Sequence, residues 1–474
     1  MSATGAVFDA MQLQAALLDV VATSHAPPRL ISQRQQQRLL RLLEAAVASP
    51  LYRERLSPHA GRGVRSTDLA RMPHVTRREL IERFDDWVTD PRLKLDELND
   101  FLRDTSRIAE PWLGDYAVWE SSGTSGQPGV FVSDARTLAV YDALEAVRHR
   151  VPPGGGRGLL RAFTAFDMLG TSDRYALVTA TGGHFASLVS FERLRRINPW
   201  VAASSRSFSL LQPVDELVAA LNEFRPSVLA TYPTAAALLA DEAEAGRLSI
   251  DVRCVTTGGE TLSPAVRERL AGVFGAQVRG SYGASEFLPI AWECAHGHLH
   301  VNEDWVLLEP VDEHYRPLPH GQRSHSVLLT NLANTVQPLI RYDLGDRVLL
   351  PGERCSCGSA LQVIDVQGRA DDVLQVPARR QGQTVSLLPM ALCTVVEEQG
   401  GVFDFQLQQQ GPNTLVLRLP LRGEAAEAAI GRCRDALQHF ALTQGAQPIV
   451  VLGEPGCDVP RGRSGKACRV ALPQ

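Results

Sequence analysis

No stretch of this sequence approaches the ~18–20 consecutive apolar residues that a membrane-spanning helix needs. The first residues (MSATG) carry no positive charge ahead of the modest apolar run that follows, so a secretory signal peptide is not expected. Basic residues are not in excess either, because 48 Lys and Arg stand against 53 Asp and Glu and the formal net charge is −5. Nothing in the composition indicates a basic face for nucleic acid. We expect a cytoplasmic protein whose partners are neither nucleic acids nor membranes.

The sequence also lacks internal repeats, low-complexity tracts and the Gly-x-x-x-x-Gly-Lys-Ser/Thr loop of P-loop nucleoside triphosphatases. With 44% hydrophobic and 21% charged residues, the composition is that of an ordinary soluble globular protein. The length of 474 residues exceeds what a single core serves, so two or more domains are expected. The eight cysteines are unremarkable in number, and their spacing favours a metal site over disulfides.

Hydrophobic periodicity predicts helices within residues 1–50 and at residues 77–84 and 137–148. The segment ending in Thr76 reads as an N-cap, and residues 116–119 read as a strand. From about residue 210 the pattern alternates, with helices predicted at 214–224, 234–245 and 263–274 and strands at 227–232, 252–257 and 277–281. This βαβα order predicts an α/β fold with a largely parallel sheet.

Beyond residue 287 the sequence changes to short β-like runs separated by Pro, Gly and Asn. Residues 369–474 then read as a small α+β unit with a hairpin (402–408 and 414–419), a helix (424–440) and a further strand (449–453). We therefore predict a large N-terminal domain, residues 1–368, with mostly parallel α/β sheets plus a β-rich portion. The remaining residues, 369–474, form a small α+β C-terminal domain in this prediction.

The stretch 120–129 (ESSGTSGQPG) holds three glycines and four hydroxyls directly after a predicted strand. Glycines let the backbone bring N–H groups against a ligand, and hydroxyls add donors that suit phosphate oxygens. A flexible surface loop is the alternative interpretation. Polar or glycine-containing turns also end the later strands, at 231–233, 256–260 and 282–286. Because ligands of open α/β sheets bind at the carboxyl ends of strands, we expect these loops to share one crevice.

Three more motifs follow along the chain: Gly345-Asp346, the Gly-Arg-x-Asp-Asp run at 368–372, and Gly465-Lys466. Each alone has an ordinary explanation as a turn, a surface ion-pair cluster or a solvated loop. Together with the loop 121–129, Gly-Gly-Glu at 258–260 and Tyr-Gly-x-x-Glu at 282–286, their order resembles the adenylate-forming superfamily of acyl-CoA synthetases, adenylation domains and luciferases.

Within that superfamily the chain is most similar to the phenylacetate–CoA ligase family. Residues 49–53 (SPLYR), 224–233 (FRPSVLATYP) and 465–470 (GKACRV) also match that family, so the resemblance covers roughly residues 49–470. It implies an enzyme that joins a carboxylic acid to ATP as an acyl-adenylate and then transfers the acyl group to a thiol.

The resemblance also implies a role for each motif. The loop 121–129 is expected to embrace the β- and γ-phosphates of ATP, with Thr124 among its donors. Glu286 is expected to bind Mg²⁺, which neutralises charge on the phosphates. Lys466 is expected to bridge the substrate carboxylate and the α-phosphate as the acyl-adenylate forms. Asp371 lies where the family has the hinge of a mobile C-terminal domain.

The same resemblance assigns the nucleotide site. Residues 258–260 are expected on the adenine side, Tyr282 beside the base, and Asp346 on the ribose hydroxyls with Arg369 close by. The full set of implied nucleotide-binding residues is Ser121, Ser122, Gly123, Thr124, Ser125, Gly126, Gly258, Gly259, Glu260, Tyr282, Gly283, Ala284, Ser285, Asp346 and Arg369.

Cysteine and histidine gather in two segments, 294–300 (CAHGHLH) and 355–357 (CSC). Three cysteines and one histidine can hold zinc tetrahedrally, and a structural zinc fixes loops that have little core of their own. Phenylacetate–CoA ligase relatives carry a similar pair of segments. The predicted zinc ligands are Cys294, His300, Cys355 and Cys357. His298 is the reserve for the fourth place, and unliganded thiols in a loop are the alternative.

One departure from the family concerns the acceptor of the acyl group. After the Gly-Arg-x-Asp-Asp run, thioester-forming relatives show a basic residue and a glycine past which pantetheine runs. Here Pro377 and the pair Arg379–Arg380 intervene before Gly382. CoA is the expected acceptor, and an amine or a carrier-protein thiol is the alternative. A non-catalytic, zinc-stabilised binding module is the alternative of a different class.

The expected acid is aryl or arylacetic, on the resemblance and on the aromatic residues available for a pocket. The candidate pocket residues are Phe163, Phe166, His184, Phe185 and Tyr232. The expected cofactors and co-substrates are therefore ATP, Mg²⁺, a structural Zn²⁺ and CoA. The sequence leaves open the identity of the acid and the oligomeric state, for which a homodimer is one option.

Overall fold

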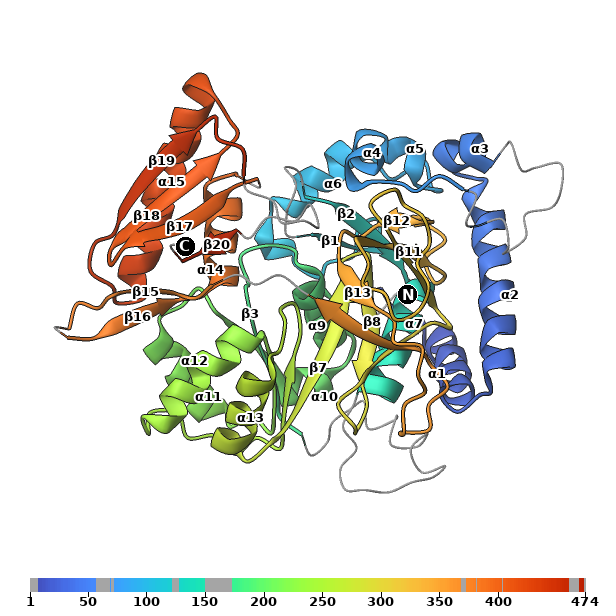
Figure 1. The fold of residues 1–474 in the computed structure, drawn as a ribbon, viewed down its shortest axis with the longest axis horizontal. Helices are drawn as coiled ribbons and strands as arrows, with labels where there is room; N and C mark the ends of the chain where they lie inside the picture. Colours follow the sequence, from blue (N-terminus) through green and yellow to red (C-terminus); the bar gives the residue numbers. More distant parts are fainter. Residues whose placement is uncertain are drawn as a thin grey trace.

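The computed structural model describes residues 7–56, 69, 72–121, 128–149, 173–367, 372–380, 382–402, 404–459 and 469–472. Its centre is a nine-stranded sheet with the strand order β13-β14-β9-β8-β7-β6-β5-β3-β4 (Figure 1). The half from β4 to β7 is parallel, and the half from β7 to β13 is antiparallel. Helices cover the sheet, so the predicted α/β class is confirmed.

The parallel half contains the βα units that the sequence predicts. Its strands are β3 (Tyr175–Thr179), β4 (Ser205–Ser209), β5 (Val228–Thr231), β6 (Cys254–Thr257) and β7 (Gln277–Ala284). Its helices are α9 (Ala186–Ile197), α10 (Pro199–Ser204), α11 (Val214–Phe224), α12 (Pro233–Glu244) and α13 (Pro264–Phe274). Proline at the first position starts α12 and α13, and Gly275 with φ +59° ends α13. The predicted elements from 214 to 281 are confirmed, except that β7 continues to Ala284.

The antiparallel half and its neighbours account for the short β-like runs. The strands of this half are β8 (Phe287–Glu293), β9 (Leu299–Val301), β13 (Arg347–Leu349) and β14 (Val363–Gln367). A separate three-stranded sheet holds β10 (Val306–Val311), β11 (Ser326–Asn331) and β12 (Tyr342–Asp343), and β1 (Tyr116–Glu120) pairs with β2 (Val130–Asp134).

Most helices of this part of the molecule precede β1 along the chain, and the last of them follows β2. They are α1 (Ala10–Ser24), α2 (Pro28–Ala46), α3 (Pro50–Leu56), α4 (Arg77–Glu82), α5 (Phe84–Trp87), α6 (Leu95–Leu102) and α7 (Ala135–Leu144), which runs into a π-helical turn (Glu145–His149). Thr76 caps α4 through its hydroxyl oxygen, as its sequence predicts. These helices, β1, β2 and the strands from β8 to β14 share one hydrophobic core. Among the described residues, no helix is both long enough and apolar enough to cross a membrane.

The C-terminal unit is built on a four-stranded sheet with the order β19-β18-β17-β20. Its strands are β17 (Gln406–Gly411), β18 (Thr414–Leu419), β19 (Val450–Pro455) and β20 (Val470–Ala471), with a hairpin of β15 (Leu374–Pro377) and β16 (Thr384–Leu387) at its start. Its helical segments are α14 (Pro389–Thr394), a π-helical turn (Val395–Gln399) and α15 (Gly423–Thr443). The predicted hairpin, helix and strand are thus present.

This unit packs on the parallel half and shares its hydrophobic core, as Figure 1 shows with the orange and red elements beside α11 and α12. Leu217 and Leu238 face Leu388 and Phe440 across the contact. The amide of Gln444 donates to two backbone carbonyls of the loop after β4, at 3.0 and 2.7 Å. The boundary between residues 368 and 369 stays a prediction, since the two parts form one core in this arrangement.

Two carboxylates meet at the contact between the C-terminal unit and β1. A Cβ atom placed on Gly183 would lie 3.0 Å from Oε1 of Glu120 and 2.9 Å from Oε1 of Glu398. Burial raises the pKa of Glu120 to about 7, and the negative charge of Glu397 adds to the shift. Glu397 itself pairs with the buried Arg469. Glu120 is therefore favoured in its neutral form at this contact.

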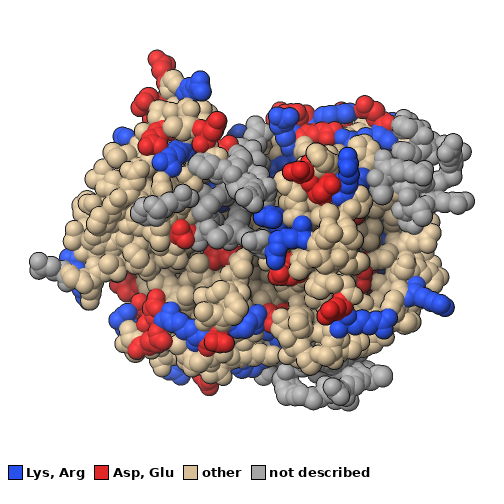
Figure 2. All heavy atoms as spheres, in the orientation of Figure 1, with Lys and Arg blue, Asp and Glu red and all other residues tan. Residues whose placement is uncertain are grey.

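Ion pairs on the surface contribute less to stability than one buried cluster of charged residues around Asp304. Positive and negative side chains are interspersed on the face that Figure 2 shows, and exposed pairs of this kind add little to stability. Asp304, by contrast, is fully buried and accepts hydrogen bonds from Arg148 at 2.7 and 3.0 Å and from the Thr23 hydroxyl at 2.9 Å. Arg38 stacks on Trp305 at 3.5 Å and donates to the Asp304 carbonyl. Asp304 therefore joins α1, α2 and the turn after α7 to the start of β10.

We expect Asp304→Asn to destabilise the protein by about 3–5 kcal/mol, because Arg148 is left buried without a counter-charge. Urea unfolding followed by circular dichroism measures the loss. Asp115→Asn is the matched control, since Asp115 is exposed and pairs with Arg92 on the surface. A loss at Asp304 no larger than that of the control would contradict a central role for this cluster.

The Glu120 carboxyl gives a pH prediction whose sign follows from its raised pKa. The folded protein holds this proton from the ordinary pKa of 4.5 up to about 7, so the contribution of Glu120 to stability falls as pH rises through that window and is constant above it. Burial also raises the pKa of the neighbouring Glu398, to about 8, so the contribution of Glu398 falls over a range that extends higher. Glu120→Gln removes the pH dependence that is due to this carboxyl. The melting temperature of the variant should therefore rise relative to that of the wild type as pH increases from 5 to 7.5. Thermal unfolding across this range checks the prediction, with the exposed Glu97→Gln on α6 as control. An equal difference at every pH would refute it.

Candidate active site and metal centre

The Ser/Gly loop leaves the end of β1 and returns at β2. Ser121 closes its base: its N–H donates to the Gly129 carbonyl at 2.8 Å, and its hydroxyl oxygen accepts from the Gly129 N–H at 2.9 Å. Ser121 was predicted to line the phosphate-binding loop. Here its hydroxyl bonds to Gly129 and so holds the two ends of that loop together. Several residues predicted to bind the phosphates lie outside the described residues: Ser122, Gly123, Thr124, Ser125 and Gly126.

The turn after β6 lies next to the ends of β5 and β7. A Cβ on Gly258 would lie 2.8 Å from the Ser281 hydroxyl. Gly259 has φ +78°, and a Cβ on it would lie 3.1 Å from the Tyr232 ring. Glycine is therefore required for these loops to approach each other. Glu260 turns its carboxylate toward α12, accepting from the Thr234 N–H at 3.1 Å and the Thr234 hydroxyl at 3.0 Å. That contact caps the start of α12. A role of Glu260 in nucleotide binding stays a prediction.

The β7–β8 turn brings two predicted site residues together with partners from later in the chain. Gly283 sits in a bulge against the backbone carbonyl of Leu288, where no side chain fits. The hydroxyl of Tyr282 donates to Oδ2 of Asp346 at 2.8 Å. The Ser285 carbonyl accepts from the Trp119 indole at 2.9 Å, which ties the turn to β1. The residues expected beside the base and at the ribose are thus neighbours.

Glu286 follows this turn and is buried. Its Oε1 accepts from the Tyr342 hydroxyl at 2.7 Å and faces Nη2 of Arg77 at 3.3 Å. Burial raises the pKa of Tyr342 above its ordinary range, so the phenol stays protonated and donates. Sequence reasoning assigned Glu286 but missed Arg77 and Tyr342. The basic residue directly after a predicted N-cap was the only available signal for Arg77.

The structure therefore gathers the described part of the predicted site at one edge of the parallel strands. The ends of β1, β6 and β7 supply Ser121, residues 258–260 and 282–286, and the turn after β12 supplies Asp346. Three further predicted residues, Arg369, Asp371 and Lys466, lie outside the described residues.

The predicted acid pocket is described in part, since Phe163 and Phe166 lie outside the described residues. Tyr232 bonds to the Thr179 hydroxyl at 2.8 Å and lies at the edge where β3, β5 and β6 end. His184 is fully buried, with Nε2 3.0 Å from the Asp104 carbonyl oxygen and its ring against Phe101. Burial lowers the pKa of His184, so its imidazole is neutral. Tyr232 borders the crevice, while His184 packs toward α6.

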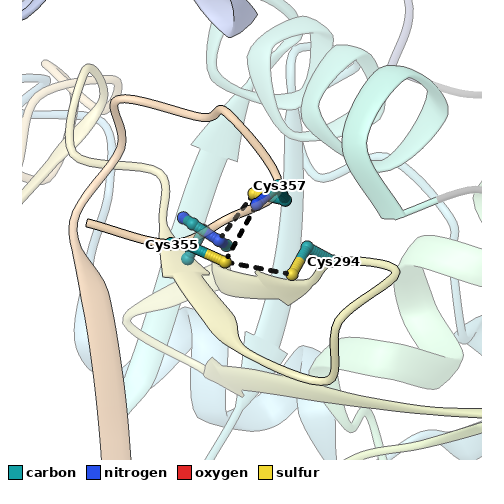
Figure 3. Close-up of side chains that lie close together, drawn as sticks. Cys294, Cys355 and Cys357 are labelled. Carbon is teal, nitrogen blue, oxygen red and sulfur yellow. Dashed lines mark hydrogen bonds between the residues drawn. The ribbon is translucent and has the colours of Figure 1, made fainter. Parts of the chain in front are cut away.

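The predicted metal ligands converge at the far end of β8. Ligand atoms of Cys294, His300, Cys355 and Cys357 all lie within 4.8 Å of one another. Figure 3 shows the three cysteine side chains turned toward one another, with the sulfurs of Cys294 and Cys355 3.8 Å apart. Nε2 of His300 lies 3.4 Å from the Cys357 sulfur. His298, the reserve ligand, is exposed and outside this group.

The surroundings of these four side chains fit a bound metal. Nδ1 of His300 lies 2.8 Å from the Leu361 carbonyl oxygen, and a proton there leaves Nε2 free as a ligand. Backbone N–H groups donate to all three sulfurs at 3.4–3.5 Å, the kind of outer contact that orients the ligands of a metal. A Cys₃His group within this distance suits tetrahedral zinc. The structure thus brings the four predicted metal ligands together.

The segment that departs from the family forms the β15–β16 hairpin, in which Pro377 pairs with Thr384. Arg379 and Arg380 are exposed in its turn. Gly382 has φ +80° and no other atom within 4 Å of a Cβ placed on it. A glycine with open space thus exists in this hairpin beyond the two arginines.

Comparisons with known proteins agree with this arrangement. Residues 108–322 match the family model of the AMP-binding enzymes. The chain is 26% identical over 361 residues to phenylacetate-coenzyme A ligase of Thermus thermophilus, which covers 73% of this chain and 72% of that protein. It is also 26% identical over 212 residues to protein CapK of Staphylococcus aureus, covering 43% and 44% of the two chains.

Among solved structures, 2-hydroxyisobutyryl-CoA ligase with 2-HIB-AMP and CoA in its thioesterification state superposes with a TM-score of 0.58 at 20% identity, over 95% of this chain and 91% of that one. An open conformation of the same ligase gives 0.53 at 20% identity, over 92% and 90%. At this identity the likeness shows the fold. Residues 108–322 are thus similar to the AMP-binding enzymes, and 73% of the chain aligns with a phenylacetate-coenzyme A ligase.

Proposed function

We propose that this protein activates a carboxylic acid with ATP to an acyl-adenylate and transfers the acyl group to CoA. The observation that carries the proposal is the convergence of the Tyr282–Asp346 pair with Glu286 beside the base of the Ser/Gly loop. A pure binding module has no need for a ribose acceptor, a buried carboxylate and a phosphate loop at one edge. The homologous phenylacetate–CoA ligase supports the same chemistry.

In the first half-reaction a carboxylate oxygen of the acid attacks the α-phosphorus of ATP. The bond from that phosphorus to the bridging oxygen breaks, and pyrophosphate leaves. Asp346 accepts from the ribose hydroxyls, the turn 258–260 borders the adenine, and Tyr282 lies beside the base. Lys466 stabilises charge that develops between the carboxylate and the phosphate.

The carboxylate of Glu286 suits a role in holding Mg²⁺. Oε1 accepts both hydrogen bonds, and Oε2 has no bonded partner among the described residues. Mg²⁺ in nucleotide sites takes one or two protein carboxylates and leaves its other positions to water and phosphate oxygens. When bound, the ion neutralises charge on the phosphates. Glu286 therefore supplies one oriented oxygen at the edge of the crevice.

In the second half-reaction the sulfur of CoA attacks the acyl carbonyl carbon, the thiol loses its proton, and AMP leaves. A turn of the C-terminal unit about Asp371 would bring the β15–β16 hairpin to the acceptor path. Gly382 has the conformation and the open space that a passing pantetheine needs. Arg379 and Arg380 are exposed at the same turn, where they suit the phosphates of CoA and equally an acidic carrier protein.

An aryl or arylacetic acid is the proposed substrate. Tyr232 directly follows β5 and Phe185 directly precedes α9, and both are partly accessible. Aromatic side chains offer apolar area with a preference for stacking on a ring.

The cytoplasmic location stays a prediction from the sequence.

The direct test is ATP–pyrophosphate exchange with a panel of aryl, arylacetic and aliphatic acids, followed by mass spectrometry of reactions that contain CoA. We expect exchange that depends on the acid and an acyl-CoA product. Exchange without acyl-CoA would move the acceptor to an amine or a carrier protein. Exchange with no acid at all would refute adenylation.

Lys466→Ala should lower the rate of pyrophosphate exchange by about 10²–10³-fold, because a donor aimed at developing charge is lost. ATP binding, measured by calorimetry, should remain near that of the wild type, because the lysine acts mainly in the transition state. Normal exchange in this variant would remove Lys466 from the mechanism.

We propose zinc as the ion at the Cys₃His site, with a structural role. β8 spans seven residues between Glu286 and Cys294, which places the site roughly 25 Å from the crevice at ~3.3 Å per residue. With four protein ligands in place, no coordination position is left for substrate. The support for zinc is the donor set and its backbone N–H bonds.

Metal analysis of freshly purified protein should find about one zinc per chain. Cys355→Ser should lose zinc and melt at a lower temperature, while enzyme that remains folded keeps its exchange rate. Cys457→Ser is the matched control, since Cys457 is similarly accessible but lies outside the group. A wild-type protein that melts normally with no bound metal would contradict the proposal.

A further inference from the structure

Arg77 is held beside Glu286 and Tyr342 by backbone pairing with a segment that lies far away in the sequence. The Val75 N–H donates to the Arg341 carbonyl at 3.0 Å, and the Asp343 N–H donates to the Val75 carbonyl at 2.9 Å. Val75 is thereby fixed beside Tyr342, and Thr76 starts α4 with Arg77 as its first residue. The backbone thus presents Arg77 to β12 and the start of β8.

The guanidinium of Arg77 makes two contacts there. Nε donates to the Tyr342 hydroxyl at 3.2 Å, and Nη2 faces Oε1 of Glu286 at 3.3 Å. Tyr342 donates to the same Oε1 at 2.7 Å. The side chain of Glu286 is 3% exposed and that of Arg77 is 19% exposed. Two donors therefore hold one oxygen of a buried carboxylate.

Two atoms of this cluster have no hydrogen-bond partner within the described part of the chain. They are Oε2 of Glu286 and the buried Nη1 of Arg77. A buried guanidinium N–H without an acceptor is costly, so such groups are uncommon unless a ligand completes them. An ion pair that serves only the fold would gain from a bidentate fork, which uses both carboxylate oxygens. This pair instead leaves one acceptor and one donor unused, at the edge where the nucleotide is proposed to bind.

We propose that Arg77 is a positioning residue for the metal–triphosphate group of ATP. Arg77 and Tyr342 fix Glu286 through Oε1, which keeps Oε2 for the cation. Nη1 of Arg77 donates to a phosphate oxygen beyond the α-phosphate. This inference rests on the proposed function, because it presumes that ATP binds in this crevice.

The inference predicts a difference between two nucleotides. ATP with Mg²⁺ engages both the carboxylate and Nη1, whereas AMP has neither the cation nor the terminal phosphates. Loss of Arg77 should therefore weaken MgATP and spare AMP. A residue that only stabilised the fold would change both affinities together.

The experiment measures the Kd of MgATP and of AMP by calorimetry for the wild type, Arg77→Gln, Arg77→Lys and the control Arg78→Gln. Arg78 is the next residue on α4, and its side chain is 88% exposed. For Arg77→Gln we expect MgATP to bind about 10–100-fold more weakly, the range of a lost charge-assisted hydrogen bond, with AMP changed by less than about twofold. Arg77→Lys should recover part of the loss, and Arg78→Gln should match the wild type.

Thermal unfolding of each variant shows whether it is folded. If Arg77→Gln does not fold because Glu286 is left without its counter-charge, the double variant Arg77→Gln/Glu286→Gln removes both charges. Its affinities for MgATP and AMP are then compared with those of Glu286→Gln alone, so that both proteins lack the proposed magnesium ligand. Unchanged MgATP binding in these variants, or an equal loss for MgATP and AMP, would overturn the inference. Failure of the wild type to bind MgATP would instead refute the proposed function, and with it this role.

Discussion

The close approach of Gly283 to the backbone of β8 is the contact on which the rest of the site depends. At this bulge the chain reverses from the parallel half of the sheet into the antiparallel half. The reversal sets Tyr282 on one side of the turn and Glu286 on the other, where Asp346 and Tyr342 meet them. A side chain at Gly283 would displace β8 and separate both pairs. One backbone contact therefore fixes the spacing of the nucleotide residues.

The same strand links the crevice to the metal centre. β8 starts next to Glu286 and ends at Cys294, whose N–H bonds to the His298 carbonyl at 2.9 Å as the chain turns back into β9. β9 pairs with both β8 and β14, and β14 follows the segment with Cys355 and Cys357. The four predicted metal ligands thus join the end of β8 and strand β9 to the segment that leads into β14.

The sequence predicted elements well where local pattern and function agree. The alternating elements between residues 214 and 281 lie where expected, because turn chemistry and strand ends are encoded locally. The pairing of β9 with β14 was not predictable, since it joins segments about 60 residues apart whose apolar runs are only a few residues long. β4 (Ser205–Ser209) was missed because Phe208 is its only large apolar residue. The contact of Arg77 with Glu286 was not predictable for the same reason as the β9–β14 pairing, because the two residues lie 209 positions apart.

The core that the C-terminal unit shares with the parallel half has a thermal consequence. Turning this unit would withdraw Leu388 and Phe440 from Leu217 and Leu238, exposing apolar surface to water. Exposing apolar surface to water raises the heat capacity, and the hydrophobic attraction that holds the two parts together weakens on cooling. The docked and turned arrangements therefore respond differently to temperature wherever new contacts do not replace the old ones. Cooling therefore weakens the hydrophobic part of the contact between the C-terminal unit and the parallel half.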